Sequence, residues 1–160
     1  MMEYGGQVIH IDPVGIYADY SALPKANIIL ITHQHGDHFD QNAISKISRS
    51  GTVLICNPEV QKMHGSGTAL KNGETTTQKG ITIKAVPACN TTPGREGFHP
   101  KGRDNGYVLE FKNLRVYVAG NTEDIPEMAE LSDIDIAFLP MNQPYTMTPG
   151  QVAKAVRRFE

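Results

Sequence analysis

The ten residues Ile31-Thr32-His33-Gln34-His35-Gly36-Asp37-His38-Phe39-Asp40 contain three of the chain's six histidines. They lie at the end of the apolar run 26–32, which predicts a short strand buried on both faces. Open α/β sheets place their ligand crevices beyond the carboxyl ends of such strands. Neutral imidazole and carboxylate are ligands that Zn²⁺, Fe and Mn²⁺ accept. The stretch therefore predicts a metal site whose ligands are His33, His35, Asp37 and His38.

The spacing of these side chains suggests how they are shared. If the chain stays extended through His33-Gln34-His35, both imidazoles point to one side, because side chains alternate with a period of two. A turn at Gly36 would then swing Asp37 and His38 toward a second point. The spacing suits two ligands on one ion and two on a neighbour, as in hydrolytic sites with two metals roughly 3.5–4 Å apart.

The rest of the chain predicts a layered α/β or α+β fold. Apolar and alternating runs predict strands at 7–12, 26–32, 52–56, 80–87, 106–111, 114–119 and 134–139. Helical spacing and capping residues predict helices at 41–50, 58–64, 125–131 and 148–159. The polar segment 89–105 is rich in Gly and Pro, and loops of more than about 12–15 residues are often functional.

Composition narrows the class of protein. The 160 residues are 39% hydrophobic and 20% charged, which is ordinary for a soluble globular domain. The net charge of −2 lacks the basic surplus of a general nucleic-acid binder. No apolar run approaches the roughly 20 residues that span a bilayer. Cys56 and Cys89 form no CxxC pattern, so we expect two buried small hydrophobes in a reducing compartment and a cytoplasmic protein without membrane partners.

His33-x-His35-x-Asp37-His38 after a strand resembles the signature of the metallo-β-lactamase-fold hydrolase superfamily. The wider pattern is similar to a small branch of metal-dependent hydrolases, related to ascorbate-6-phosphate lactonase-like proteins and to N-acylphosphatidylethanolamine phospholipase D. The resemblance implies a four-layer αββα sandwich with the metals at one edge. The similar segments are Ile11-Asp12-Pro13, the histidine motif, Val86-Pro87-Ala88, Gly102-Arg103-Asp104-Asn105-Gly106, Ala119-Gly120-Asn121-Thr122-Glu123 and Phe138-Leu139-Pro140.

Three positions depart from the superfamily pattern. Asn90 stands where a third histidine completes the first metal site. Asn121 stands where an aspartate usually bridges the two metals. A last histidine normally comes from a strand beyond the final helix, and this sequence ends at Glu160. Because an amide is neutral and a weaker ligand than a carboxylate, we expect one ion, or two held weakly, with Asn121 as a candidate ligand.

The same departures set expectations for the fold. We expect one metallo-β-lactamase-like domain over residues 1–160, truncated at the C-terminus, with an incomplete second half. An incomplete half leaves a sheet edge and an apolar face short of cover, so a second copy of the chain is a candidate to cover it.

The loop 89–105 offers further candidates. His99 is a candidate replacement for the missing ligand, with a surface histidine as the alternative, and Cys89 is a candidate thiolate with a buried structural role as the alternative. Arg95 and Arg103 are candidates for binding an anionic small molecule, because guanidinium groups suit phosphate and carboxylate, with solvated or structural charges as the alternative. Tyr145 is a candidate for lining the pocket, with a core or rim residue as the alternative, whereas His10 and His64 are interpreted as structural.

These residues support three hypotheses. The first is a hydrolase that uses metal-activated water on a small ester, lactone or phosphoester, with one or two divalent ions, zinc before iron or manganese. In it, Asp37 is catalytic, binding metal and orienting the nucleophile. The second is a degenerate relative that binds metal or ligand without efficient turnover. The third is a nuclease of the same superfamily, which the near-neutral charge disfavours.

Overall fold

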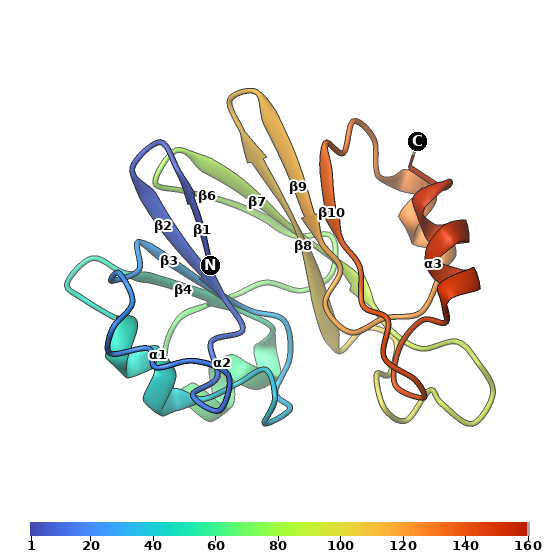
Figure 1. Cartoon of the computed structure of the whole chain (residues 1–160), viewed down its shortest axis with the longest axis horizontal. Helices are drawn as coiled ribbons and strands as arrows, with labels where there is room; N and C mark the ends of the chain where they lie inside the picture. Colours follow the sequence, from blue (N-terminus) through green and yellow to red (C-terminus); the bar gives the residue numbers. More distant parts are fainter. Residues whose placement is uncertain (160) are drawn as a thin grey trace. The chain divides into compact units, whose positions relative to one another are not determined.

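The computed structural model describes residues 1–159 and divides into two compact units, the first from Met1 to Leu70 and the second from Lys71 onward. Within residues 1–159 there are ten strands in two five-stranded sheets, three α-helices and one 3-10 helix (Figure 1). Each sheet belongs to one unit. The predicted mixed α/β fold class is confirmed, whereas the prediction of one domain over 1–160 stays a prediction.

The first unit is built on a mostly parallel sheet of order β1-β2-β3-β4-β5, in which only β1 and β2 pair antiparallel. Its elements are β1 (Met2–Tyr4), β2 (Gln7–Ile11), β3 (Ile28–Ile31), α1 (Gln41–Ile47), β4 (Val53–Cys56), α2 (Pro58–His64) and β5 (Thr68–Ala69).

The central strand β3 anchors this unit. All four of its residues are buried, as the unbroken apolar run predicts. Ile29 and Ile31 pack in one cluster with Ile44 and Ile47 of α1 and with Val60 of α2. Burying one such side chain stabilises the fold by roughly 1.5–3 kcal/mol. Both helices lie on the same side of the sheet (Figure 1), so β3 has a fixed position from which the histidine stretch departs.

The helices of this unit begin where their capping residues predict. The Asp40 carboxylate accepts hydrogen bonds from the backbone N–H groups of the first turn of α1, and Asn57 does the same for α2. However, α1 ends at Ile47 rather than at the predicted residue 50. Ser48 is extended, with ψ of 150°, and its hydroxyl donates to the Ile44 carbonyl at 2.7 Å, which terminates the helix.

The second unit is built on a mainly antiparallel sheet of order β10-β9-β8-β7-β6, whose edge strand β10 runs parallel to β9. Its elements are β6 (Thr75–Gln78), β7 (Ile81–Ala88), β8 (Asp104–Phe111), β9 (Leu114–Val118), the 3-10 helix η1 (Pro126–Glu130), β10 (Ile136–Phe138) and α3 (Pro149–Val156). Thr148 caps α3 through a capping box with Gln151, as its position before Pro149 predicts.

A glycine allows β8 to lie close to the end of β9. Gly106 of β8 pairs with Val86 of β7. A Cβ atom at Gly106 would lie 2.8 Å from the Ala119 carbonyl oxygen and 2.9 Å from that of Val118. Real Cβ atoms do not approach backbone oxygens so closely, so this close approach of the strands requires a residue without a side chain.

Several elements differ from expectation for identifiable reasons. The strand β6 has the sequence Thr-Thr-Thr-Gln, which lacks apolar alternation, and it forms by pairing with β7. β1 and β5 are only three and two residues long, too short for a periodic pattern. The segment predicted as a helix over 125–131 is a 3-10 helix over five of those residues. Residues 72–73 and 112–113, each pair containing an Asn, form turns.

The edge strand β10 exposes apolar side chains. Ile136 is 44% exposed and Phe138 is 56% exposed. The prediction that a second copy of the chain covers this face stays a prediction. Among residues 1–159, no helix has both the length and the apolar character needed to cross a bilayer.

Replacing Asp40 by alanine tests the cap of α1. Backbone N–H groups of Gly15 and Ala43 hold the pKa of Asp40 below its ordinary value. We expect Asp40→Ala to lower the free energy of unfolding by about 1 kcal/mol at pH 7. The difference should narrow as the pH falls through the lowered pKa, because a carboxylate whose pKa is depressed by folding stabilises only while it is ionised.

Urea denaturation across a pH series measures this effect. The matched control is Glu3→Ala, which removes an exposed carboxylate from the same unit. Equal stability losses in the two variants at pH 7 would contradict the assigned cap.

Candidate metal centre

The chain turns directly after β3 and gathers three imidazole rings. The backbone N–H groups of His38 and Phe39 both donate to the His35 carbonyl, at 2.9 and 2.8 Å, so the turn begins at His35, one residue before Gly36. The ring centroid of His33 lies 4.7 Å from that of His35 and 4.1 Å from that of His38. The predicted separation into two pairs of ligands is thus less marked than expected, because His33 packs against both other rings.

Asp37 lies on the exposed side of this turn. Its side chain is 55% exposed, and its Oδ2 atom is 3.6 Å from Nε2 of His38. The carboxylate is therefore beside the imidazole nitrogen of a neighbouring candidate ligand while remaining open to solvent. This position suits both binding an ion and contacting a small molecule.

Asp12, which follows β2, organises the turn. Its Oδ1 accepts from the Thr32 backbone N–H at 2.8 Å, and its Oδ2 accepts from the Thr32 hydroxyl at 2.7 Å. The same Oδ2 lies 2.8 Å from Nδ1 of His38. Asp12 adopts a φ of 45°, a left-handed conformation that aspartate tolerates better than most residues. One carboxylate therefore binds both ends of the histidine stretch.

These contacts determine which ring nitrogen carries the proton. The Thr32 hydroxyl has one proton and donates it to Asp12, so at 2.9 Å it accepts from Nδ1 of His33. Nδ1 of His38 likewise faces a carboxylate, which only accepts. When these rings are neutral, Nε2 of each carries the lone pair. Partners that hold one imidazole nitrogen in this way are typical of metal-ligating histidines.

Sequence reasoning missed Asp12 and Thr32 as parts of the site. Asp12 stood out only as part of the segment Ile11-Asp12-Pro13. The available signal was that Asp12 is a polar residue at the end of a strand that runs parallel to β3 and lies next to it. Neighbouring parallel strands end at the same sheet edge, so their terminal residues lie close together. Nothing in the sequence indicated the left-handed φ or the contacts 20 and 26 residues away.

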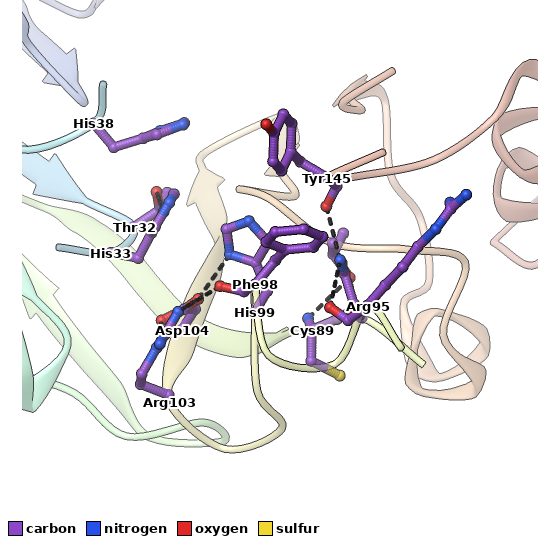
Figure 2. A network of polar contacts seen from close by, with 12 residues as sticks. Thr32, His33, His38, Cys89, Arg95, Phe98, His99, Arg103, Asp104 and Tyr145 are labelled. Atoms are coloured by element: carbon purple, nitrogen blue, oxygen red, sulfur yellow. Dashed lines mark hydrogen bonds and ion pairs between the residues drawn. The ribbon is translucent and has the colours of Figure 1, made fainter. Parts of the chain in front are cut away.

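In the second unit, His99 is buried against a carboxylate. Its Nδ1 lies 2.9 Å from Oδ2 of Asp104, and both side chains are at most 1% exposed. Arg103 donates from Nε to Oδ1 of Asp104 at 2.7 Å and from NH2 to Oδ2 at 2.9 Å (Figure 2). His99 is therefore not the surface histidine that was the alternative interpretation. The prediction that it joins the ligands of the first unit stays a prediction.

Asn90 supports the loop that carries His99. Its side-chain Nδ2 donates to the carbonyls of Tyr145, at 2.8 Å, and Arg95, at 3.2 Å. Its backbone N–H donates to the His99 carbonyl at 2.8 Å. At the position where the superfamily pattern has a histidine, this chain thus has an amide with structural contacts. Asn121 is partly exposed in the loop after β9.

The guanidinium of Arg95 also has protein partners. It donates to Gln143 at 2.8 Å and lies 3.7 Å from the buried carboxylate of Glu123. Burial works to raise the pKa of Glu123, but hydrogen bonds from Thr91 and Thr92 outweigh it and hold the pKa below its ordinary value. Arg95 and Arg103 are each about 30% exposed, at 31% and 29%, and their predicted role in binding an anion stays a prediction.

Tyr145 lies at the same part of the second unit. Its ring packs edge-on against Phe98, with centroids 4.9 Å apart, and the side chain is 45% exposed (Figure 2). Phe98 is partly buried, and the predicted role of Tyr145 in lining a pocket stays a prediction.

The remaining histidines and thiols have structural environments. His10 is buried with Nε2 3.0 Å from the Pro24 carbonyl, and Nδ1 of His64 lies 3.0 Å from the Ser66 hydroxyl. Cys56 and Cys89 are buried and not disulfide-bonded. Burial raises the pKa of Cys56 to about 12, so its thiol is protonated and unreactive at neutral pH.

The donors of the turn fit a divalent metal ion. Three imidazoles and one carboxylate are the ligand types that zinc and its neighbours take, and two of the rings have their second nitrogen held by Asp12 or Thr32. His33, His35, Asp37 and His38 are thus suited to hold an ion by their chemistry and by their mutual approach.

Replacing Asp12 by alanine tests the organising role of this carboxylate. We expect Asp12→Ala to weaken binding of a divalent ion by roughly 10- to 100-fold, because His38 and Thr32 lose the partner that orients them. Thr32→Val removes the hydroxyl that joins Asp12 to Nδ1 of His33 but keeps the contacts of Asp12 with the Thr32 backbone and with His38, so it should cause a smaller loss. Competition with a colorimetric chelator measures both. The control is Asp19→Ala, since that carboxylate accepts hydrogen bonds from Ser21 in a different loop, and equal affinities for all variants would contradict the assignment.

Comparison with known proteins identifies the family. A family model described as the beta-lactamase superfamily domain matches residues 1–160. A UPF0173 metal-dependent hydrolase of Thermococcus kodakarensis is 34% identical over 141 residues, covering 82% of this chain and 62% of the relative. One of Pyrococcus abyssi is 33% identical over 166 residues, covering 95% and 72%. The chain spans only 60–62% of the length of the Thermococcus and Thermus relatives.

Comparison with solved structures agrees with this family assignment. A crystal structure from Parabacteroides distasonis, described as that of a candidate metal-dependent hydrolase, is 59% identical with a TM-score of 0.97, covering 99% of this chain and 72% of that one. A diphosphatase of the PhnP family is 19% identical with a TM-score of 0.70, covering 98% and 66%, and it shows the fold alone. The closer assignment to lactonase-like or phospholipase D-like proteins stays a prediction. The chain belongs to the metallo-β-lactamase-fold superfamily, among relatives that are named metal-dependent hydrolases.

Proposed function

We propose that this protein is a metal-dependent hydrolase of a small, anionic ester, lactone or phosphoester, with His33, His35, Asp37 and His38 as metal ligands. The observation that carries the proposal is the gathering of three imidazoles within residues 33–38, with Asp12 contacting Thr32 at one end of this stretch and His38 at the other. Zinc is the proposed ion, because a nitrogen-rich set with a carboxylate suits it.

A bound divalent ion supplies Lewis acidity, lowering the pKa of water toward about 7 and polarising the bond that is cleaved. The residues of the chain orient the donor atoms and the nucleophile. Thr32 and Asp12 hold Nδ1 of His33 and His38, which presents Nε2 of both rings as donor atoms. Asp37 is open to solvent and beside His38, and we assign it the orientation of the nucleophile as well as metal binding.

The proposal includes His99 as a further ligand. The surroundings of His99 in the second unit support this role, because the buried carboxylate of Asp104 contacts its Nδ1. A carboxylate behind an imidazole is a frequent arrangement at metal sites. The partly exposed guanidinium groups of Arg95 and Arg103 support the choice of an anionic substrate, because guanidinium recognises phosphate and carboxylate.

Two amides favour a second candidate function, which is binding of metal or ligand without efficient turnover. Asn90 has its side-chain amide engaged with two backbone carbonyls rather than offering an imidazole. Asn121 replaces a carboxylate that would hold two dications together by its charge.

Metal analysis together with a hydrolysis assay separates these functions. We expect the purified protein to contain near-stoichiometric Zn, Fe or Mn and to hydrolyse bis(p-nitrophenyl) phosphate or a simple lactone. A chelator should abolish turnover, and the ion should restore it. His33→Ala should lose the metal, whereas the control His64→Ala should keep it. Stoichiometric metal without turnover would favour the second candidate, and failure to bind any of the three ions would overturn the hydrolase and the metal-binding form of the second candidate.

Restoring a carboxylate at position 121 tests the bridging argument. We expect Asn121→Asp to raise the amount of bound metal per chain, because a carboxylate is a stronger ligand than an amide. Asn113→Asp, in the exposed turn between β8 and β9, is the control with the same change in charge. If metal content is the same in Asn121→Asp as in the original protein, position 121 takes no part in metal binding.

A further inference from the structure

His99 is held at two points by the strands that flank its loop. The side chain contacts Asp104, the first residue of β8, at 2.9 Å. The backbone carbonyl of His99 accepts from the N–H of Asn90, two residues past the end of β7. Because β7 and β8 pair along their length, with Ala88 opposite Asp104, both contacts come from one rigid part of the sheet.

Asp104 is itself fixed on all sides. Its side chain is fully buried, and Arg103 contacts both carboxylate oxygens, at 2.7 and 2.9 Å. The NH2 group of Arg103 also donates to the Phe98 carbonyl at 2.8 Å, which ties the residue before His99 to the same guanidinium. The backbone carbonyl of Asp104 accepts from Asn72 at 2.9 Å. A buried carboxylate with a bidentate arginine has a defined orientation.

This geometry has a chemical consequence for the imidazole. A carboxylate is an acceptor only, so the ring nitrogen that faces it carries the proton. In a neutral ring the lone pair is then on the other nitrogen, the one suited to bind a metal ion. The alternative tautomer would place a lone pair against the carboxylate and lose the hydrogen bond in a buried site, where an unmade hydrogen bond is costly.

We infer that Asp104 and Arg103 are positioning residues that preset His99 as the Nδ1–H tautomer, with Nε2 as the donor atom, before any metal binds. The inference rests on the proposed function for the role of His99 as a ligand. It also gives Arg103 a defined task, which is to hold the carboxylate that holds the imidazole.

Long-range ¹H–¹⁵N NMR of the metal-free, full-length protein at neutral pH tests the tautomer directly. We expect Nδ1 of His99 to appear as protonated and Nε2 as unprotonated, with the resonance assigned by its loss in His99→Gln. Observation of the Nε2–H tautomer in the original protein, at a pH where the ring is neutral, would overturn the inference. This measurement needs neither metal nor activity, so it is independent of the proposed function.

Variants then test the two positioning residues. In Asp104→Asn, whose amide is able to donate as well as accept, we expect the fixed Nδ1–H tautomer to be lost and zinc affinity to fall roughly 10- to 100-fold. Arg103→Lys keeps the charge but not the bidentate contact. This variant should lose less of the tautomer preference and less zinc affinity. The control Lys101→Ala removes an exposed residue of the same loop, whose partner is Glu127, and should change neither.

The two readouts separate the two claims. If His99→Gln leaves zinc affinity unchanged, the ligand role proposed for His99 fails, while the tautomer measurement still decides the inference. If Asp104→Asn keeps the Nδ1–H tautomer unchanged, Asp104 does not set it and the inference is wrong. If Asp104→Asn does not fold, the inference is tested by the tautomer of His99 in the original protein and in the Arg103→Lys variant.

Discussion

The contact between the Asp12 carboxylate and the turn after β3 is the interaction on which the candidate site depends. Three imidazoles in one short turn repel one another when protonated and lose their mutual orientation when mobile. Asp12 counters both effects, because it contacts Thr32 before the first of these histidines and His38, the last of them. The buried strand β3 and the helices packed on it supply the rigid support that this contact requires.

A comparable arrangement occurs in the second unit. There a buried carboxylate, Asp104, begins a strand and contacts the histidine of the adjoining loop. In each unit an aspartate near a strand end orients an imidazole, and in each the aspartate is held by further hydrogen bonds. Strand ends suit this task because their backbone is fixed by the sheet, whereas the histidines lie in segments without regular structure.

Features of the fold and the site could be predicted from the sequence when the residues that form them are close together along the chain. The caps Asp40, Asn57 and Thr148 were predictable, because a cap acts on residues two or three positions away. The family followed from the short motif that ends at His38. The contacts of Asp12 and the contact between Asn90 and Tyr145 were not predictable, since they join residues 20 to 55 positions apart. The strand β6 was missed because its residues are polar and its pairing with β7 creates it.

The close approach at Gly106 bears on how this protein tolerates change. Where β8 passes the end of β9, backbone meets backbone, and the nearest oxygen leaves no volume for even a methyl group. A library that randomises β8 should therefore recover folded variants with many residues at its other positions and with glycine alone at this one. The same point is unsuitable for attaching a spectroscopic label, although it lies only two residues from the carboxylate that contacts His99.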